Sequence, residues 1–263
     1  MSPSAAAAYS ATGAAWERGP ARIYDRLAEL VVAALPVAVA GGSALDLGAG
    51  TGAATRALVA AGAARVVAVD AAVGMLAHDA AQRPPAVAGD ALALPFAVGA
   101  FDATVAAFSL NHLADPAAGL REAARVTRPG GALAASAYAD DDDHPVKHAV
   151  VAALTARGWT PEPWYQALQR DAAPKLATVD AARAAAVAAG LDADVEHTRV
   201  PFPDLDAPAL IAWRLGLAQH APFFDALPTD AERAALAEDA AARLGGSWPP
   251  LERSIIILGA VRR

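Results

Sequence analysis

Three glycines at alternate positions lie in the segment Asp46-Leu-Gly-Ala-Gly-Thr-Gly52, which begins at the end of a short apolar run. Glycines at this spacing let the backbone turn tightly after a strand and approach a ligand closely, because no Cβ stands in the way. A helix that begins just after them would direct its free N–H groups toward that ligand. The loop alone leaves an alternative open, since Gly48, Gly50 and Ala53 with Asp70 also fit a nicotinamide-dinucleotide loop.

Acidic residues follow the next two strand-like segments. Asp70 ends the run 65–70, and Asp90 follows the short run 86–88. At the carboxyl ends of neighbouring parallel strands, Asp70 can accept both hydroxyls of a ribose and Asp90 can accept from an adenine amino group. Asp46 can orient the loop or a cationic ammonium. These acids favour a cofactor that joins adenosine to an amino acid.

These motifs resemble those of class I S-adenosylmethionine-dependent methyltransferases, in particular the branch similar to ubiquinone/menaquinone C-methyltransferases and natural-product methyltransferases. The resemblance covers roughly residues 45–138 and is carried by Asp46-Leu-Gly-Ala-Gly-Thr-Gly52, Val67-Ala-Val-Asp70, Gly89-Asp-Ala-Leu-Ala-Leu-Pro-Phe96, Phe101-Asp102, Asn111-His-Leu113 and Arg128-Pro-Gly-Gly131. It implies S-adenosyl-L-methionine as the cofactor and S-adenosyl-L-homocysteine as the product.

The resemblance also implies a part of the cofactor for each motif. The loop would hold the amino-acid end, Asp70 the ribose and Asp90 the adenine amino group, while Met75 and Leu92 would sandwich the adenine ring. Ordinary core packing explains Met75 and Leu92 equally well. The expected cofactor-binding residues are Asp46, Gly48, Ala49, Gly50, Thr51, Gly52, Asp70, Ala71, Met75, Gly89, Asp90, Ala91, Leu92, Phe108 and Asn111.

Methyl transfer from a sulfonium is an in-line displacement, so a general base is needed only when the nucleophile carries its proton. His112 is the expected catalytic base, because it lies just past the fourth strand beside the expected methyl group. The alternative is that this histidine packs against or caps the following turn. Asn111 could bind substrate or cofactor.

Aromatic residues gather in the N-terminal segment and in two late insertions. Tyr9, Trp16 and Tyr24 lie in the N-terminal segment, which in this family folds over the cofactor. The expected substrate contacts are Tyr24, Trp16, Trp164, Trp213 and His220, although core packing or a helix end explains each of them singly. The aromatic content of the insertions favours an apolar or planar substrate.

Strand-like and helix-like segments alternate from 43 to 138, which predicts a parallel sheet covered on both faces. The resemblance implies seven strands with the last, 254–261, antiparallel. We therefore expect an α/β, Rossmann-like three-layer sandwich with a seven-stranded, mostly parallel sheet and helical cap insertions. A single methyltransferase domain (1–263) would comprise N-terminal cap helices (1–36), a cofactor-binding core (43–138) and cap/substrate insertions (139–179 and 204–250). The second insertion is expected to contain helices at 207–220 and 229–244.

Charge and composition exclude several functions. A net charge of −7 without a run of lysine or arginine argues against a nucleic-acid partner. The chain lacks cysteine, so nothing indicates an oxidising compartment, and its apolar stretches carry charges, prolines and glycines that argue against a membrane span. We expect a cytoplasmic monomer or homodimer with a small-molecule substrate. The acidic run Asp140-Asp-Asp-Asp-His144 is expected to be a solvated loop, and no metal site is expected.

The leading hypothesis is therefore S-adenosylmethionine-dependent methyl transfer to O, N or C of a small apolar or aromatic metabolite, of the kind found in secondary metabolism. A methyltransferase-fold protein that catalyses a non-methylating cyclisation or isomerisation is the second hypothesis, because some relatives do this on the same scaffold. A nicotinamide-dependent oxidoreductase is the third, although the chain lacks a catalytic Tyr-x-x-x-Lys pair.

Overall fold

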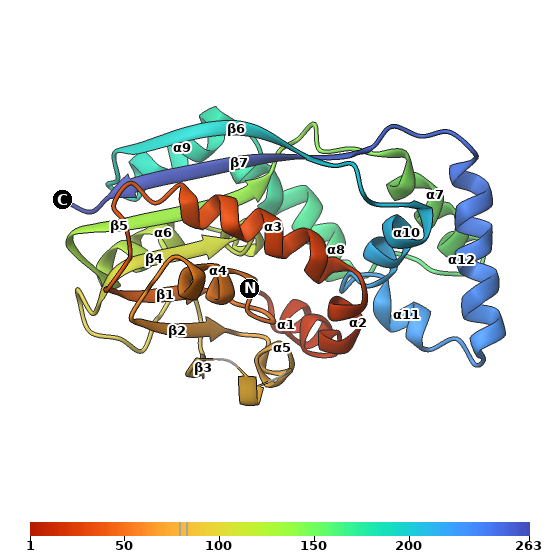
Figure 1. Ribbon diagram of the computed structural model, residues 1–263, viewed down its shortest axis with the longest axis horizontal. Helices are drawn as coiled ribbons and strands as arrows, with labels where there is room; N and C mark the ends of the chain where they lie inside the picture. The colour runs from red at the N-terminus through yellow and green to blue at the C-terminus, as the bar shows by residue number, and fades with distance from the viewer. Residues whose placement is uncertain (79, 83) are drawn as a thin grey trace.

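The computed structural model describes residues 1–78, 80–82 and 84–263. Within them, seven strands form one sheet in the order β3-β2-β1-β4-β5-β7-β6 (Figure 1). The strands are β1 (Ser43–Leu47), β2 (Arg65–Asp70), β3 (Ala86–Ala88), β4 (Phe101–Ala107), β5 (Thr127–Tyr138), β6 (Ala193–Phe202) and β7 (Leu251–Val261). Only β7 runs antiparallel to its neighbours, β5 and β6. The predicted fold class and the antiparallel last strand are confirmed.

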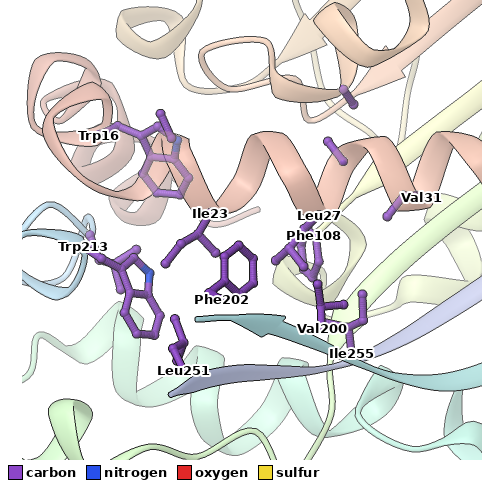
Figure 2. Packing of buried hydrophobic residues seen from close by; sticks show 14 of the residues in the cluster. Trp16, Ile23, Leu27, Val31, Phe108, Val200, Phe202, Trp213, Leu251 and Ile255 are labelled. Atoms are coloured by element: carbon purple, nitrogen blue, oxygen red, sulfur yellow. The ribbon is translucent and has the colours of Figure 1, made fainter. Parts of the chain in front are cut away.

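Two layers of helices cover the sheet, because successive strand residues face opposite sides. On one face, α3 (Pro20–Ala33) and α4 (Ala53–Ala60) pack in a cluster with Ala44 and Val66. On the other face, α6 (Pro116–Val126) and α9 (Val179–Ala188) pack in a cluster with the next residues along the same strands, Leu45 and Val67. Figure 2 shows the first cluster, where Ile23 and Leu27 of α3 lie over Phe202 and Val200.

The strand order changes direction between β1 and β4. The chain first adds β2 and β3 on one side of β1 and then continues with β4 on the other side. In open α/β sheets, such a reversal leaves a crevice beyond the carboxyl ends of the strands, and ligands bind there. The topology therefore places the end of β1, with the glycine loop, at the crevice.

The N-terminal segment forms α1 (Pro3–Ser10) and α2 (Gly13–Arg18) before α3. The end of α1 is fixed to α5 (Val73–Ala77), where the Gly74 amide donates to Ser10 Oγ at 3.2 Å. The contact is so close that a Cβ on Gly74 would lie 2.0 Å from the Ser10 carbonyl oxygen. Only glycine allows α1 to dock there.

The remaining helices are α7 (Pro145–Thr155), α8 (Pro163–Ala167), α10 (Ala207–Leu215), α11 (Ala221–Asp225) and α12 (Asp230–Leu244), with short helical turns at η1 (Ala80–Gln82), η2 (Leu110–His112), η3 (Leu168–Ala172) and η4 (Ala173–Leu176). Of these, α7, α10, α11 and α12 gather at one end of the molecule (Figure 1). Across the described residues, no helix combines the length and apolar character needed to cross a membrane.

The predicted helix 207–220 was wrong in its extent. It ends at Leu215, and a separate helix, α11, begins at Ala221. Pro222 explains the restart, because proline lacks the amide hydrogen and its ring clashes with a helical carbonyl four residues earlier, yet it is tolerated in a first turn.

Candidate functional site

A pocket lies at the carboxyl ends of β1, β2 and β4, and its volume is about 990 Å³ up to and including its open mouth. The sequence motifs meet there. The predicted site residues that line it are Trp16, Tyr24, Asp46, Gly48, Ala49, Gly50, Thr51, Asp70, Ala71, Met75, Gly89, Asp90, Ala91, Phe108 and His112. Residues far apart in the chain thus share one cavity.

The glycine loop turns against β2 and β4. The amides of Gly48 and Ala49 both donate to the Val69 carbonyl oxygen, at 2.7 and 3.0 Å. Gly48 has a φ of +77°, and a Cβ there would lie 2.2 Å from the Ser109 Cβ. Ser109 is itself fixed, because its hydroxyl donates to the Leu47 carbonyl oxygen at 2.6 Å. Position 48 therefore requires glycine for both its backbone conformation and its surroundings.

Asp46 is a buried carboxylate with one oxygen satisfied. Its Oδ2 accepts from the Thr55 hydroxyl at 2.6 Å, whereas its Oδ1 is buried and has no hydrogen-bond partner among the described residues. Burial raises the pKa of Asp46 to about 6. A buried acceptor without a donor is costly, so this oxygen fits a ligand that brings a donor, above all a cationic ammonium.

Asp70 connects the loop to the second strand. Its two carboxylate oxygens accept from the amides of Gly50 at 2.8 Å and Ala72 at 2.7 Å. A carboxylate has acceptor sites for about four hydrogen bonds, so Asp70 can also receive hydroxyl donors from a ligand in the pocket. Asp90 lies on the same wall and accepts from the Leu92 amide at 3.0 Å.

His112 stands in η2, beyond the end of β4, and faces the N-terminal segment. Its imidazole meets the ring of Tyr9 edge to face, with ring centroids 5.3 Å apart. Burial lowers the pKa of His112 to about 4 and raises the pKa of the Tyr9 phenol. At neutral pH the pair is thus a neutral imidazole, able to accept a proton, beside a protonated phenol.

Aromatic side chains form part of the lining of the pocket. Tyr24 lies 4.6 Å from Trp16 and 5.6 Å from Phe108, measured between ring centroids. Phe108 stacks on Tyr138 at 4.6 Å. Phe108 has a φ of +54°, a left-handed conformation that is found at no other non-glycine position of the described chain. Backbone strain of this kind persists where the surrounding structure enforces it, and it is concentrated at functional sites.

Six predicted site residues do not line the pocket: Gly52, Leu92, Asn111, Trp164, Trp213 and His220. Gly52 precedes α4 with a φ of +96°, and Leu92 is 44% exposed. Asn111 is buried, and its Oδ1 has no partner among the described residues. Contact of Gly52, Leu92 and Asn111 with the cofactor stays a prediction. Their positions outside the lining of the pocket do not support it.

The three predicted substrate contacts outside the pocket are buried in the cap. Trp164 packs behind Tyr9, with ring centroids 6.0 Å apart. Trp213 belongs to the core that Figure 2 shows, and His220 is fully buried with its Nδ1 2.7 Å from the Arg214 carbonyl oxygen. Their role as substrate contacts stays a prediction. Core packing explains the positions of Trp213 and His220 better.

The pocket also contains residues that were not among the expected site residues, notably Met1, Tyr9 and Ser109. The sequence offered a reason to expect Tyr9 in the site, since it is an aromatic residue in a segment expected to fold over the cofactor. It offered none for Ser109, because the position of Ser109 depends on the approach of β4 to the glycine loop.

The carboxylates of the acidic loop after β5 pair with different basic side chains. Asp141 pairs with Arg199 at 2.5 Å, Asp142 with Arg253 at 2.8 Å and Asp143 with His148 at 2.9 Å. Within the described ranges, no group of three or more histidine or acidic side chains is arranged to hold a metal ion.

Residues 45–135 match the family model described as "Methyltransferase domain". The demethylmenaquinone methyltransferase of Mycolicibacterium vanbaalenii is 57% identical over 89 residues, which are 34% of this chain and 39% of that protein. The protein of the same name from Mycobacterium tuberculosis is 53% identical over 93 residues, 35% of this chain and 39% of the relative. The match therefore spans about two fifths of the relatives' length.

Solved structures share the fold over nearly the whole chain. A chain from the complex of the Haloferax volcanii Trm112 methyltransferase activator with a methyltransferase superposes with a TM-score of 0.61 at 22% identity, covering 98% of this chain and 97% of that chain. The [4+2]-cyclase SpnF superposes with a TM-score of 0.54 at 23% identity, covering 90% and 81%. Residues 45–135 thus match a methyltransferase domain and are similar to demethylmenaquinone methyltransferases, and the chain as a whole shares the fold of these solved structures.

Proposed function

We propose that the protein transfers the methyl group of S-adenosyl-L-methionine to a small-molecule acceptor held beneath the N-terminal helices. The observation that supports this most is that Asp46, whose buried Oδ1 lacks a hydrogen-bond donor, lines the same pocket as Asp70 and Asp90. A ligand that brings an ammonium, a ribose and an adenine satisfies all three carboxylates together, whereas a dinucleotide brings no ammonium to Asp46.

The residues present fit this cofactor along its length. Asp46 and the loop 48–52 would hold the amino-acid end, Asp70 the ribose hydroxyls, and Asp90 with Met75 the adenine. Met75 is buried, lines the pocket and accepts from the Thr12 hydroxyl at 3.9 Å, so the N-terminal segment is connected to the adenine side. The cofactor supplies an electrophilic methyl group that is open to in-line displacement.

The chain's own contribution would be to orient the acceptor, exclude water and take up a proton. His112 would accept the proton of an acceptor hydroxyl or amine at an imidazole nitrogen, since its pKa of about 4 keeps it neutral. Tyr9 is a positioning residue, because its ring contacts the imidazole edge to face. Tyr24, Trp16 and Phe108 give the acceptor an apolar, aromatic surface.

The acceptor is proposed as a small apolar or aromatic metabolite, with methylation at O, N or C. The aligned relatives are named for demethylmenaquinone, but the alignment covers 34% of this chain, and the family match ends at residue 135. The insertions 139–179 and 204–250, which would select the acceptor, follow that match. The lack of cysteine agrees with a cytoplasmic location.

Calorimetric titration tests the cofactor assignment. We expect S-adenosyl-L-homocysteine to bind the purified protein and NAD⁺ not to bind. Asp70→Asn should weaken the affinity for S-adenosyl-L-homocysteine by about tenfold or more, the usual loss for hydrogen bonds to a charged group. Asp194→Asn, at an exposed position of β6, is the matched control.

Binding of NAD⁺ in place of S-adenosyl-L-homocysteine would contradict the proposal. Turnover of an acceptor without consumption of S-adenosyl-L-methionine would instead indicate a non-methylating reaction on the same scaffold.

A further inference from the structure

Two arginines are buried beside one tryptophan in the cap. Arg214 of α10 is 8% exposed and Arg253 of β7 is 3% exposed. Their guanidinium carbons lie 5.3 and 4.6 Å from the ring centroid of Trp213. Arginine is rarely buried to this extent unless an anion pairs with it.

The carboxylate nearby is already occupied. Arg253 donates from Nε and Nη2 to Asp142 at 2.9 and 2.8 Å, and Lys147 lies 2.6 Å from the same carboxylate. Arg214 has no hydrogen bond or ion pair from its guanidinium to any described residue. The cluster of Arg214, Arg253, Lys147 and Asp142 thus holds three cations and one anion, an imbalance that burial makes unfavourable.

Donors in this cluster are left without acceptors. The Nε of Arg214 and the Nη1 of Arg253 are buried and have no hydrogen-bond partner among the described residues. The Tyr138 hydroxyl interacts with Tyr24, and the Arg253 guanidinium lies 3.9 Å from the Tyr138 ring centroid. Two buried guanidinium nitrogens without acceptors, both beside Trp213, indicate a site for an acceptor that the chain does not supply.

The cluster adjoins the cofactor pocket through aromatic rings. Tyr138 stacks on Phe108, which lines the pocket, and lies 6.1 Å from Tyr24, which also lines it. The positive charges of Arg253 and Arg214 both lower the pKa of Tyr24, against the larger effect of burial, which raises it. Tyr24 therefore both lines the pocket and lies within the electrostatic reach of the two arginines.

We propose that Arg214 and Arg253 bind the carboxylate of the methyl acceptor, so that the acceptor is a planar aromatic acid whose ring lies against Tyr24 and Phe108. The planar guanidinium fork suits a carboxylate, and the aromatic rings suit a planar ring system. This inference rests on the proposed methyl transfer, and it specifies the acceptor class that the function leaves open.

The test compares an acid with its neutral analogue on the cofactor-product complex. With S-adenosyl-L-homocysteine bound, para-hydroxybenzoate and para-hydroxybenzamide are titrated by calorimetry into the wild type and Arg214→Gln. We expect the acid to bind the wild type at least about tenfold more tightly than the amide, and Arg214→Gln to remove that preference. Arg22→Gln, at an exposed position of α3, should leave the preference unchanged.

A second measurement separates a binding role from a structural one. Arg214→Met should raise the Tm of the ligand-free protein, because it removes a buried cation that has no anionic partner. Arg253→Met should lower it, because Asp142 would lose its principal partner. A lower Tm for Arg214→Met would overturn the proposal, since Arg214 would then stabilise the fold itself.

The outcomes distinguish this inference from the proposed function. S-adenosyl-L-homocysteine is titrated first, and its failure to bind the wild type would contradict methyl transfer. Normal S-adenosyl-L-homocysteine binding, with no binding of the acid or no preference for it over the amide, would overturn the anion site alone. Inorganic phosphate that binds more tightly than the acid, and loses that binding in Arg214→Gln, would overturn the carboxylate assignment.

Discussion

The ring of Tyr9 meets the imidazole of His112 edge to face, with the centroids 5.3 Å apart and the planes at 87°. One residue belongs to the first helix of the chain and the other to the turn beyond β4. Because both residues line the pocket, we expect the N-terminal helices to control how much solvent reaches the candidate base.

The protonation of His112 should depend on its burial beneath the N-terminal helices. The pKa of His112 is about 4 because burial disfavours the charged imidazolium, so the neutral form should prevail from pH 8 down to about pH 5. Carbon-detected NMR titration of the histidine rings, with the signal assigned by His112→Gln, measures this. Tyr9→Ala should move the midpoint upward toward the ordinary value of about 6.5, whereas Tyr9→Phe should not. A midpoint near that ordinary value in the wild type would contradict the burial argument.

Asp46 should make the ligand-free protein less stable as the pH rises. Its pKa of about 6 lies above the unfolded value of 3.8, so the folded state binds more protons between these two pH values. The free energy of unfolding therefore falls as the pH rises through that window, by up to about 3 kcal/mol for a shift of about two units. Asp46→Asn should abolish this dependence.

Urea unfolding of the wild type and Asp46→Asn at pH 4.5, 5.5 and 7 compares the two slopes. The variant should also bind S-adenosyl-L-homocysteine more weakly, because an amide cannot form an ion pair with the ammonium. Parallel pH dependence of the two proteins would mean that Asp46 is not responsible.

Gly48→Ala separates backbone conformation from steric crowding when it is compared with Gly41→Ala. Both glycines have φ near +75°, at +77° and +74°, but a Cβ at Gly41 would meet nothing within 4 Å. We expect Gly41→Ala to cost about 1 kcal/mol of unfolding free energy from the left-handed backbone alone. Gly48→Ala should cost about 1–3 kcal/mol more, because its Cβ overlaps Ser109.

The double variant Gly48→Ala/Ser109→Gly removes the Cβ that would overlap. It should recover stability relative to Gly48→Ala and should not reach the wild type, because the backbone strain at position 48 persists. Chemical denaturation measures all four proteins, and equal losses for Gly41→Ala and Gly48→Ala would show that crowding by Ser109 is unimportant.

The strands between residues 43 and 138 could be predicted because they depend on local patterns. A buried strand such as β1 reads as an apolar run that ends at glycine, and the acids at 70 and 90 mark the ends of the next two strands. Parallel strands bring their carboxyl ends to one edge, so these acids were expected to share a site, and they line one pocket. The break in the helix predicted at 207–220 was missed, although Gly216 directly follows the last helical residue, Leu215.

The packing of the cap could not be predicted from the sequence, because its contacts are between segments far apart in the chain. Trp213 and His220 are typical residues of an aromatic substrate site, yet both are fully buried among other cap residues. The neighbouring Arg214 carries no motif at all, and its lack of a partner follows only from how α10 packs near Arg253. Alanine-rich helices give few side-chain signals from which such packing could be predicted.

The docking of α1 on α5 should control access to the pocket, and Gly74 tests this. A Cβ at Gly74 would lie 2.0 Å from the Ser10 carbonyl oxygen, so Gly74→Ala must displace the end of α1. We expect a loss of about 1–3 kcal/mol of unfolding free energy from crowding. Hydrogen–deuterium exchange should rise in residues 3–12, and S-adenosyl-L-homocysteine should dissociate faster, because α1 carries Tyr9 over the pocket.

Gly246→Ala is the control, since a Cβ there would meet nothing within 4 Å and the residue lies outside the left-handed region. It should change neither exchange in residues 3–12 nor the dissociation rate. If Gly74→Ala accelerates exchange in α1 without changing the dissociation rate, the N-terminal helices do not gate the cofactor. The exposure of His112 to solvent would then have to be governed by another part of the cap, and the NMR midpoint of His112 in Gly74→Ala would stay near pH 4.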